Sequence, residues 1–421
     1  MKSRTVNFPS LQAIKEARKT LESVINTTPL QKSFRLSKQM DADIFLKRED
    51  MQPVRSYKIR GAYNKMYSLY KDQKVENGVV CASAGNHAQG VAFACRKLKI
   101  AGTIFMPVTT PKQKLEQVAM FGEKYVEIKL IGDTFDDSKN AAITFSENSG
   151  AAFIHPFDDV EIIEGQATVA MEILEQTDSP IDFVFVPLGG GGLAAGIVTV
   201  FSILSPRTKI IIVEPKGAAS MKASVEAGIN TELPHIDKFV DGAAVQKVGD
   251  LTFEICKDYI HDCIAVDEGK VCETLLELYN KDAMVLEPAG ALTIAALDLY
   301  KDQIQGKNVV CIASGSNNDI TRTEEIKERA MLYKGLKHYF IVKFPQRPGA
   351  LKEFVLNVLG KSDDITFFEY TKRNSRETAS AIVGIEVPSF LDFEELLHRM
   401  KQAGYFESYL NDSPNMMNIL I

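Results

Sequence analysis

Short apolar runs alternate with longer helix-like stretches between about residues 40 and 320. Most runs are rich in Val, Ile and Phe and are bounded by Gly, Pro or Asn, which is typical of buried strands. The runs are residues 43–50, 77–85, 101–108, 151–157, 182–190, 208–215 and 307–315. The stretches between them, such as residues 86–99 and 110–122, have helical periodicity. Strand and crossover helix in alternation predict an α/β fold with parallel sheets covered on both faces.

The pattern changes near residue 325. A charged helical segment at 324–337 comes first and is expected to connect two domains. Strand, helix, strand, strand, helix and strand then follow at residues 338–344, 350–360, 363–373, 379–387, 389–404 and 415–421. This order predicts a ferredoxin-like α+β domain. Because it contains no obvious nucleophile, general base or phosphate loop, we interpret it as a regulatory or assembly module.

The composition fits a soluble globular protein of two or three domains. The chain has 421 residues, 45% hydrophobic and 25% charged, with a net charge of −6. Charges of both signs are mixed along it, which argues against a nucleic-acid partner. The amphipathic N-terminal segment lacks the apolar core of an export signal, so we expect a cytoplasmic protein. Residues 183–206 are uncharged and long enough to cross a membrane, but a proline and four glycines interrupt them, which favours a buried strand–turn–helix.

The cysteines and histidines form no pattern that indicates a metal site. The six cysteines are scattered without a CxxC pair, and the six histidines do not cluster. We therefore expect buried free thiols in a reducing compartment and no bound metal.

Ligands of parallel sheets bind at the carboxyl ends of the strands. One such end, before a predicted helix, carries Gly189, Gly190, Gly191, Gly192 and Leu193. Consecutive glycines let backbone N–H groups approach an anion, and the helix N-terminus adds a favourable dipole, so we predict a phosphate site. Gly189, Gly191 and Ala194 also satisfy the dinucleotide fingerprint, with Glu214 after the next strand. An NAD site therefore stays open on these residues alone.

Lys58 lies where the helix after residues 43–50 is expected to begin. The positive end of a helix disfavours an ammonium group and lowers the pKa of a lysine. A neutral amine is what a Schiff base with an aldehyde cofactor requires. Lysine and arginine together number 49, so Lys58 would be taken for a surface residue if it stood without the other motifs.

Two further strand ends carry polar residues. The first has Ser83, Ala84, Gly85, Asn86 and His87, and the second has Ser314. Hydroxyl and N–H groups at a helix start can hold a carboxylate, Asn86 can donate to a phenolic oxygen, and Ser314 can bond a heterocycle nitrogen. Helix capping and a polar turn explain the same residues. Glu287, before an alanine-rich helix, fits either a site carboxylate or a helix-terminal residue.

Together these motifs resemble the fold type II family of pyridoxal-phosphate enzymes. The segments LKREDMQPVRSYKIRGAYNK, CASAGNHAQGVA, GGGGLAAG, DGAAV, EPAGA and SGSNND occur in the family's order over about residues 10–320. Within the family they are most similar to biosynthetic threonine dehydratases, and RPGAL at 347–351 resembles the turn-to-helix signature of ACT-like domains. The resemblance implies two open parallel-sheet subdomains in three αβα layers, followed by a ferredoxin-like ACT-like domain.

The resemblance also implies the roles of the site residues. Lys58 would hold pyridoxal 5'-phosphate as a Schiff base and act as the catalytic base. The four glycines and Leu193 would bind its phosphate, Asn86 the ring 3-oxygen, Ser314 the ring nitrogen, and residues 83–87 the substrate carboxylate. The implied reaction converts L-threonine to 2-oxobutanoate and ammonia by β-elimination, as an ammonia-lyase of isoleucine biosynthesis. Isoleucine and valine are the implied effectors, and a homo-oligomer, either tetramer or dimer, is the implied assembly.

Some positions depart from the family pattern. Ala84 stands where serine racemases carry a second serine, which argues against racemisation. Ser220 stands where some relatives carry an acidic cation ligand, so no divalent metal is expected. Ser316 replaces a glycine of the commoner S-G-G-N, which leaves its role open. Only one ACT-like unit fits at the C-terminus, which leaves the strength and sign of regulation open.

We expect a catalytic domain at residues 1–325, with a smaller subdomain at about 55–155 inserted in the larger one. A linker at 326–335 and an ACT-like domain at 336–421 would follow. Three alternatives stay open. They are a serine dehydratase or other β-elimination or β-replacement enzyme of this fold, a nicotinamide dehydrogenase, and a non-catalytic amino-acid sensor.

Overall fold

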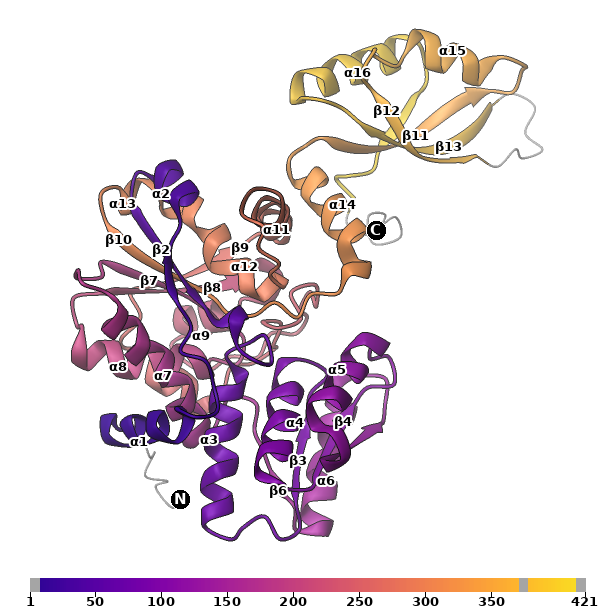
Figure 1. Cartoon of the computed structure of the whole chain (residues 1–421). Helices are drawn as coiled ribbons and strands as arrows, with labels where there is room; N and C mark the ends of the chain where they lie inside the picture. Colours follow the sequence, from indigo (N-terminus) through magenta and orange to yellow (C-terminus); the bar gives the residue numbers. More distant parts are fainter. Residues whose placement is uncertain (1–7, 371–377, 414–421) are drawn as a thin grey trace. The chain divides into compact units, whose positions relative to one another are not determined.

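The computed structural model describes residues 8–370 and 378–413 of the chain (Figure 1). The chain divides into two compact units, Met1–Asp319 and Ile320–Ile421. The first unit contains two separate sheets, one parallel and one parallel except for its edge strand β1, and the second unit contains one antiparallel sheet. The predicted fold class, α/β followed by a ferredoxin-like α+β domain, is confirmed.

The larger sheet of the first unit has six strands in the order β1-β2-β10-β7-β8-β9. They are β1 (Leu30–Lys32), β2 (Asp43–Arg48), β7 (Phe183–Pro187), β8 (Lys209–Pro215), β9 (Asp262–Val266) and β10 (Asn308–Ala313). Only the edge strand β1 runs antiparallel, and the other pairs are parallel. Strand β10 pairs with both β2 and β7, so early and late parts of the unit meet in the middle of this sheet.

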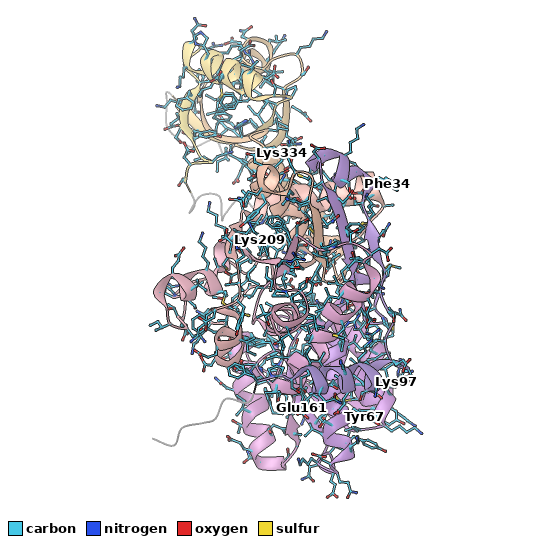
Figure 2. The ribbon with its side chains drawn as sticks, turned by 90° about the vertical axis from the view of Figure 1, so that its left-hand side faces the viewer. Phe34, Tyr67, Lys97, Glu161, Lys209 and Lys334 are labelled. Atoms are coloured by element: carbon cyan, nitrogen blue, oxygen red, sulfur yellow. The ribbon has the colours of Figure 1, made fainter. Side chains whose placement is uncertain are left out.

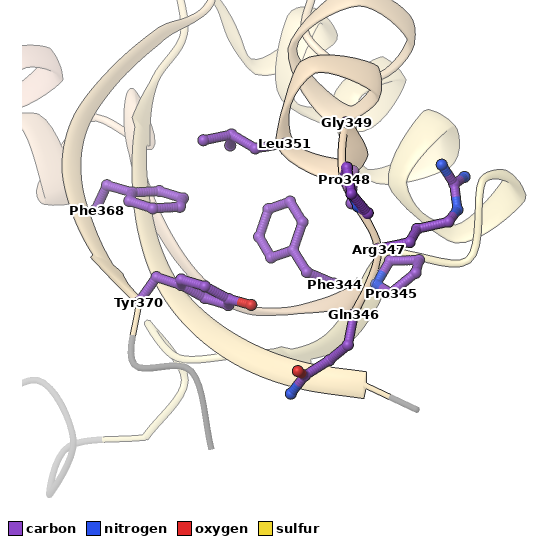
Figure 3. Close-up of a pocket in the computed structure, with 10 residues that line it drawn as sticks. Phe344, Pro345, Gln346, Arg347, Pro348, Gly349, Leu351, Phe368 and Tyr370 are labelled. Atoms are coloured by element: carbon purple, nitrogen blue, oxygen red, sulfur yellow. The ribbon is translucent and has the colours of Figure 1, made fainter. Parts of the chain in front are cut away.

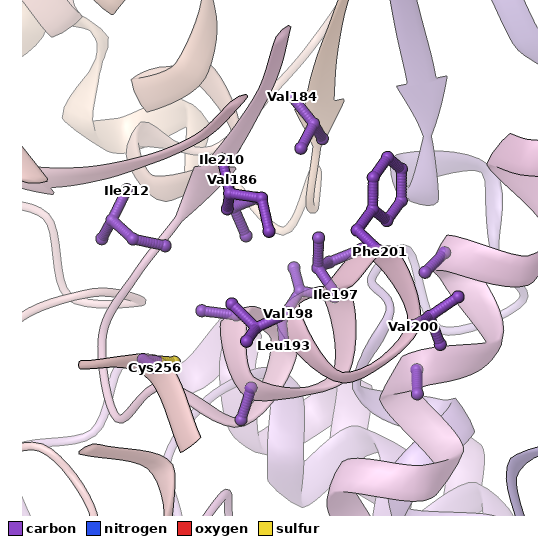
Figure 4. Packing of buried hydrophobic residues seen from close by; sticks show 14 of the residues in the cluster. Val184, Val186, Leu193, Ile197, Val198, Val200, Phe201, Ile210, Ile212 and Cys256 are labelled. Atoms are coloured by element: carbon purple, nitrogen blue, oxygen red, sulfur yellow. The ribbon is translucent and has the colours of Figure 1, made fainter. Parts of the chain in front are cut away.

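Helices cover both faces of the larger sheet. Val184 and Val186 pack against Leu193, Ile197 and other residues of α8 in one apolar cluster (Figure 4). The alternate side chains point to the opposite face, where the Phe185 ring meets Tyr300 at 5.3 Å between centroids. Burial on both faces explains why the central strands β7, β8 and β10 carry continuous apolar runs. The helices of this region are α1 (Leu11–Leu21), α2 (Phe34–Met40), η1 (Glu49–Met51), α7 (Val160–Gln176), α8 (Gly192–Leu204), η3 (Lys216–Ala218), α9 (Ser220–Ala227), α10 (Asp250–Cys256), α11 (Glu268–Asp282), α12 (Pro288–Ala295), η4 (Ala296–Tyr300) and α13 (Lys301–Ile304).

The smaller sheet has four parallel strands in the order β5-β4-β3-β6. They are β3 (Val79–Ala82), β4 (Gly102–Met106), β5 (Val126–Leu130) and β6 (Ala152–Phe153). Its helices are α3 (Lys58–Lys71), α4 (Asn86–Leu98), α5 (Lys112–Gly122), η2 (Glu123–Tyr125) and α6 (Phe135–Ser149). Cys81 and Ile104 face the cluster under α3 and α4, whereas Val80 and Phe105 face Ala142 of α6. Both faces are therefore covered here as well.

The second unit follows the predicted order of strands and helices. Its elements are η5 (Ile320–Arg322), α14 (Thr323–Tyr333), β11 (Lys337–Pro345), α15 (Ala350–Asn357), β12 (Asp364–Tyr370), β13 (Thr378–Glu386), α16 (Phe390–Gln402) and β14 (Phe406–Tyr409). The antiparallel sheet has the order β12-β13-β11-β14, so 406–409 supplies its fourth strand. The strand predicted at 415–421 lies outside the described residues. Helix α14, in the predicted linker, is tied to β11 by an ion pair of 3.1 Å between Lys337 and Glu328.

The described helices include none that is both long and apolar enough to cross a bilayer. The uncharged stretch 183–206 instead forms β7, the four-glycine turn and α8. Hydrophobic side chains also occur singly at the surface, where Phe34 of α2 is 86% exposed (Figure 2). The six cysteines are free and buried.

Candidate active site

Lys58 is the first residue of α3, and its side chain is only partly exposed. Its Nζ donates to the carbonyl of Pro156 at 2.8 Å, in the segment after β6. Burial lowers the pKa of Lys58 to about 8, and the negative charge of Glu287 opposes this shift without cancelling it. The sequence predicted a lowered pKa from the helix dipole, whereas the largest cause is loss of solvation. An appreciable fraction of this amine is therefore neutral at physiological pH.

The four-glycine turn lies against the same segment. A Cβ at Gly190 would lie 2.1 Å from Cδ1 of Phe157, so the aromatic ring covers the backbone at this point. Gly191 has φ +92°, which favours glycine, and no side chain caps the helix α8 that starts at Gly192. The Pro156 carbonyl accepts from Lys58, and the next residue, Phe157, packs on the turn. The Lys58 amine and the glycine turn therefore contact the same short segment.

A hydroxyl group fixes the backbone of the glycine turn. Thr252 Oγ1 donates to the carbonyl of Gly190 at 2.8 Å, and the N–H of Gly249 donates to the same oxygen at 3.2 Å. A Cβ at Gly191 would lie 2.7 Å from Thr252 Oγ1. Leu193 is 1% exposed and belongs to the core of the larger sheet. The bonds to the Gly190 carbonyl therefore hold the turn in place. The backbone N–H groups at the start of α8 stay available to bind an anion.

Residues 83–87 link β3 to α4. The N–H of Gly85 donates to Ser83 Oγ at 3.2 Å, and nothing lies within 4 Å of the position that a Cβ of Gly85 would take. His87 is buried and its Nε2 is hydrogen-bonded to the carbonyl of Ile154 at 3.0 Å. Burial, with a smaller effect from the charge of Lys58, lowers the pKa of His87 to about 3. His87 is therefore neutral, and a substrate carboxylate would be held here by N–H and hydroxyl groups.

Asn86 and Glu287 meet across the two sheets of the first unit. Asn86, at the start of α4, donates from Nδ2 to Glu287 Oε1 at 2.6 Å. Burial and the neighbouring Asp241 raise the pKa of Glu287 to about 7. Glu287 makes no side-chain cap to α12, so of its two sequence interpretations the structure supports the site carboxylate. On the sequence alone, both interpretations explained Glu287 equally well.

Ser314 lies at the end of β10 and is 3% exposed. Its Oγ donates to the carbonyl of Ala289 at 3.3 Å, and its own carbonyl accepts from the N–H of Tyr57 at 3.3 Å. Ser314 is therefore joined to the residue before Lys58. The structure thus brings together Lys58, Asn86, Ser314 and, through segment 154–158, the glycine turn.

These groups fit an aldehyde cofactor with an anionic arm. The amine has a lowered pKa, a helix start without a side-chain cap lies nearby, and amide and hydroxyl groups are available for a ring. Ser56 Oγ is also buried and has no hydrogen-bond partner among the described residues. A buried hydroxyl without a partner, two positions from the amine, is consistent with a site completed by a ligand.

The dinucleotide alternative is not supported by the surroundings of Glu214. This carboxylate is fully buried and accepts from the N–H groups of Met221 at 2.8 Å and Lys222 at 2.9 Å. Its oxygens bind backbone N–H groups in the first turn of α9, so they do not form a ribose site. Within residues 8–370 and 378–413 no group of three or more His, Cys, Asp or Glu side chains is arranged to hold a metal.

The sequence did not identify the contributions of segment 154–158 and of Thr252. Pro156 acts through its carbonyl and Phe157 through its ring, and neither residue type marks a site by itself. The position of the segment could have indicated it, because it follows β6 in a parallel sheet, where ligands bind at the carboxyl ends of the strands.

The second unit has a cavity of about 330 Å³ at the turn between β11 and α15 (Figure 3). It is lined by Phe344, Pro345, Gln346, Arg347, Pro348, Gly349, Ala350, Leu351, Phe368 and Tyr370. The Arg347 guanidinium pairs with Glu353 at 2.6 Å, so the exposed lining is mainly apolar and aromatic.

Two family models match the chain. Residues 21–315 match the pyridoxal-phosphate dependent enzymes, and residues 328–420 match the C-terminal regulatory domain of threonine dehydratase. The chain therefore belongs to the fold type II pyridoxal-phosphate dependent enzymes, in the group that carries the threonine dehydratase regulatory domain.

Relatives of known name cover almost the whole chain. The biosynthetic L-threonine dehydratase IlvA of Halalkalibacterium halodurans is 53% identical over 405 residues, which is 96% of this chain and 97% of that protein. The enzyme of the same name from Bacillus subtilis is 53% identical over 97% of this chain and 96% of its own length. The processed form of threonine deaminase isoform 2 from Solanum lycopersicum has a TM-score of 0.73 and 39% identity, covering 78% of this chain and 92% of that one. Maize serine racemase has a TM-score of 0.71 at 30% identity, covering 78% of this chain and 99% of that one.

Proposed function

We propose that this protein is a pyridoxal-phosphate dependent threonine ammonia-lyase that converts L-threonine to 2-oxobutanoate and ammonia, as a step of isoleucine biosynthesis. The chemistry is supported by one observation above the others, the desolvated Lys58 amine held against the segment that covers the glycine turn. The substrate is supported by the near-complete match to biosynthetic L-threonine dehydratases. Serine dehydratase is the alternative within the fold, and these relatives do not favour it.

We propose that Lys58 holds the cofactor, the glycine turn with Leu193 binds its phosphate, Asn86 donates to its 3-oxygen, and Ser314 bonds its ring nitrogen. Bound pyridoxal phosphate supplies an aldehyde for imine formation and a ring that takes up the negative charge left when Cα is deprotonated. The Lys58 amine, neutral in part at pH 7, takes the Cα proton as a general base. N–H and hydroxyl groups of residues 83–87 hold the substrate carboxylate and orient the Cα–H bond.

The balance of the reaction follows from these roles. Threonine loses its Cα proton and its β-hydroxyl group, which together make one water molecule. The enamine that is released takes up water and loses ammonia, which leaves 2-oxobutanoate. Ala84 supplies no hydroxyl that could return a proton to Cα from the other side, in contrast to the serine racemases of the fold.

The test is the visible spectrum of the purified protein before and after adding L-threonine, with 2-oxobutanoate measured in the same sample. We expect a visible absorbance band that changes with threonine, together with a higher kcat/KM for threonine than for serine. A colourless protein that binds NAD would contradict the proposal, and so would a kcat/KM that favours serine.

We further propose that the second unit binds isoleucine or valine as an effector. The cavity beside α15 supports this, since Phe344, Phe368 and Tyr370 give it aromatic walls suited to a branched aliphatic side chain. Calorimetry on the full chain should detect isoleucine or valine but not aspartate, and Phe368→Ala should weaken binding more than Phe390→Ala on α16. Equal binding by both variants would contradict this location.

The proposal includes a cytoplasmic homo-oligomer, either tetramer or dimer. Light scattering of the purified protein distinguishes the two assemblies, and a monomer at assay concentration would contradict both.

A further inference from the structure

Asn317 lies three residues beyond Ser314, and the proposed function gives it no part. Its Nδ2 donates to Asn86 Oδ1 at 2.6 Å and to the carbonyl of Val54 at 3.0 Å. Asn86 in turn donates from its Nδ2 to Glu287 Oε1 at 2.6 Å. A continuous series of hydrogen bonds therefore runs from the segment before Lys58, through two amides, to a buried carboxyl group.

The direction of this series is fixed at its Val54 end. The Val54 carbonyl only accepts, so Asn317 faces it with nitrogen and uses its second hydrogen on Asn86. Asn86 must then turn its oxygen toward Asn317 and its nitrogen toward Glu287, which accepts through Oε1. If Asn86 were reversed, its nitrogen would meet the nitrogen of Asn317, and its oxygen would meet the carboxyl group of Glu287.

Two features indicate that the direction serves a ligand. Glu287 uses one hydrogen of Asn86 Nδ2, which leaves the second hydrogen for another acceptor. Asn317 Oδ1 is buried and has no hydrogen-bond partner in the described part of the chain. An orientation that served folding alone would be expected to satisfy this oxygen, because an unpaired buried acceptor is costly.

We propose that Asn317, acting with Glu287, is a positioning residue that sets the direction of the Asn86 amide, so that an N–H and not the oxygen faces the bound cofactor. This rests on the proposed function, in which Asn86 donates to the ring 3-oxygen. A reversed amide would present oxygen to oxygen, which would weaken cofactor binding and shift its absorbance while Lys58 stays in place.

The direct test is Asn317→Asp, which keeps the side-chain shape and replaces nitrogen by oxygen. Its matched control is Asn148→Asp, the same change at an exposed position of α6. We expect Asn317→Asp to raise the Kd of pyridoxal phosphate about tenfold, to shift the visible band and to lower kcat for threonine, whereas the control changes none of these. Asn317→Ser, which is too short to reach Asn86 and adds no charge, should shift the band in the same direction even if Asn317→Asp fails to fold. An unshifted band with a Kd within about twofold of the wild type would overturn the proposal.

A double-mutant cycle on the cofactor-free chain tests the direction itself. In the double variant Asn317→Asp/Glu287→Gln, the glutamine at 287 can donate to Asn86 Oδ1 and Asn86 can donate to the aspartate, so both bonds of Asn86 can reverse, while the bond to the Val54 carbonyl stays lost. We expect the melting temperature lost in Asn317→Asp to return in part, while the cofactor Kd stays raised because Asn86 faces the wrong way. Additive losses of melting temperature would overturn the proposal, and so would recovery of cofactor affinity together with stability.

The two proposals fail in different ways. The melting temperatures are measured without cofactor, so the cycle reports on the hydrogen-bond series whether or not the wild-type chain deaminates threonine. A wild-type chain that binds no pyridoxal phosphate would overturn the proposed function, and additive melting temperatures would overturn the role of Asn317.

Discussion

Lys58 and Arg60 stand two residues apart in the first turn of α3, and their surroundings are opposite. Lys58 donates to one carbonyl and has no carboxylate partner among the described residues, and burial lowers its pKa to about 8. Arg60 is fully buried and binds both oxygens of Glu49 at 2.7 Å and both oxygens of Glu172 at 2.7 and 2.9 Å. These carboxylates raise the pKa of Arg60 against the effect of desolvation.

The difference separates a reactive group from a structural one. A buried cation with matched carboxylates stays charged and fixes the elements that carry them, here the segment after β2 and α7. A buried amine without such partners gives up its proton easily, which a base or a Schiff-base lysine needs. Burial of a basic side chain alone therefore does not identify the site. The presence or absence of carboxylate partners distinguishes the structural group from the reactive one.

The largest effect should come from Lys58→Ala. Without the amine there is no group to take the Cα proton, so we expect threonine turnover to fall by at least about 10⁴-fold. The melting temperature should stay close to the wild type, because the change removes one hydrogen bond, to the Pro156 carbonyl, and the contact with the Tyr57 ring. The measurement is 2-oxobutanoate formation together with a thermal melt, and activity within tenfold of the wild type would refute the assignment.

Arg60→Met should have the opposite pattern. It leaves Glu49 buried without its arginine and Glu172 paired with Lys47 alone, which should cost about 3–5 kcal/mol of unfolding free energy. The control is Arg96→Met, which breaks the partly exposed pair with Glu123 and should cost no more than about 1 kcal/mol. Both values come from denaturant titration. Equal stabilities of the two variants would show that the cluster around Arg60 does not fix the segment after β2 and α7 as described.

Gly190→Ala tests the packing of the glycine turn against the segment that binds Lys58. The new Cβ must displace the Phe157 ring, next to the carbonyl that accepts from Lys58, so we expect a loss of about 1–3 kcal/mol in stability and weaker cofactor binding. Gly404→Ala is the control, since it has open space and only the strain of φ +74°. Adding Phe157→Leu to Gly190→Ala should restore part of the loss, and an unchanged double variant would contradict the close packing.

The smallest effect is a shift in pH dependence. Only the neutral amine attacks an aldehyde, so the rate of cofactor capture by the cofactor-free protein should rise with pH to a midpoint near the Lys58 pKa of about 8. Glu287→Gln removes a charge that raises this pKa, so its midpoint should lie lower. His87, with a pKa of about 3, stays neutral throughout. Stopped-flow absorbance gives both profiles, and a midpoint near that of an ordinary lysine, 10.5, would contradict the desolvation of Lys58.

Much of the fold was predictable because it depends on local pattern. Val, Ile and Phe runs bounded by turn residues predicted the strands, and the change of pattern near 325 predicted an antiparallel unit. The exact domain limits were not predictable, since the helical pattern of α14 fits either unit, and its bonds from Glu328 to Lys337 and Tyr339 of β11 show which unit it belongs to. The domain limits and the roles of the site residues stay predictions.

The sequence by itself determined which groups stand at strand ends, because parallel strands bring their carboxyl ends to one edge whatever their order along the chain. It therefore predicted the glycine turn, residues 83–87 and Ser314 as candidate groups, and the resemblance to fold type II enzymes joined Lys58 to them. Only the tertiary structure decided how each group is charged and oriented. Loss of water around Lys58, the carboxylates around Arg60 and the amide order from Asn317 to Glu287 arise from residues distant in sequence, and solvation and hydrogen-bond direction depend on such neighbours in space.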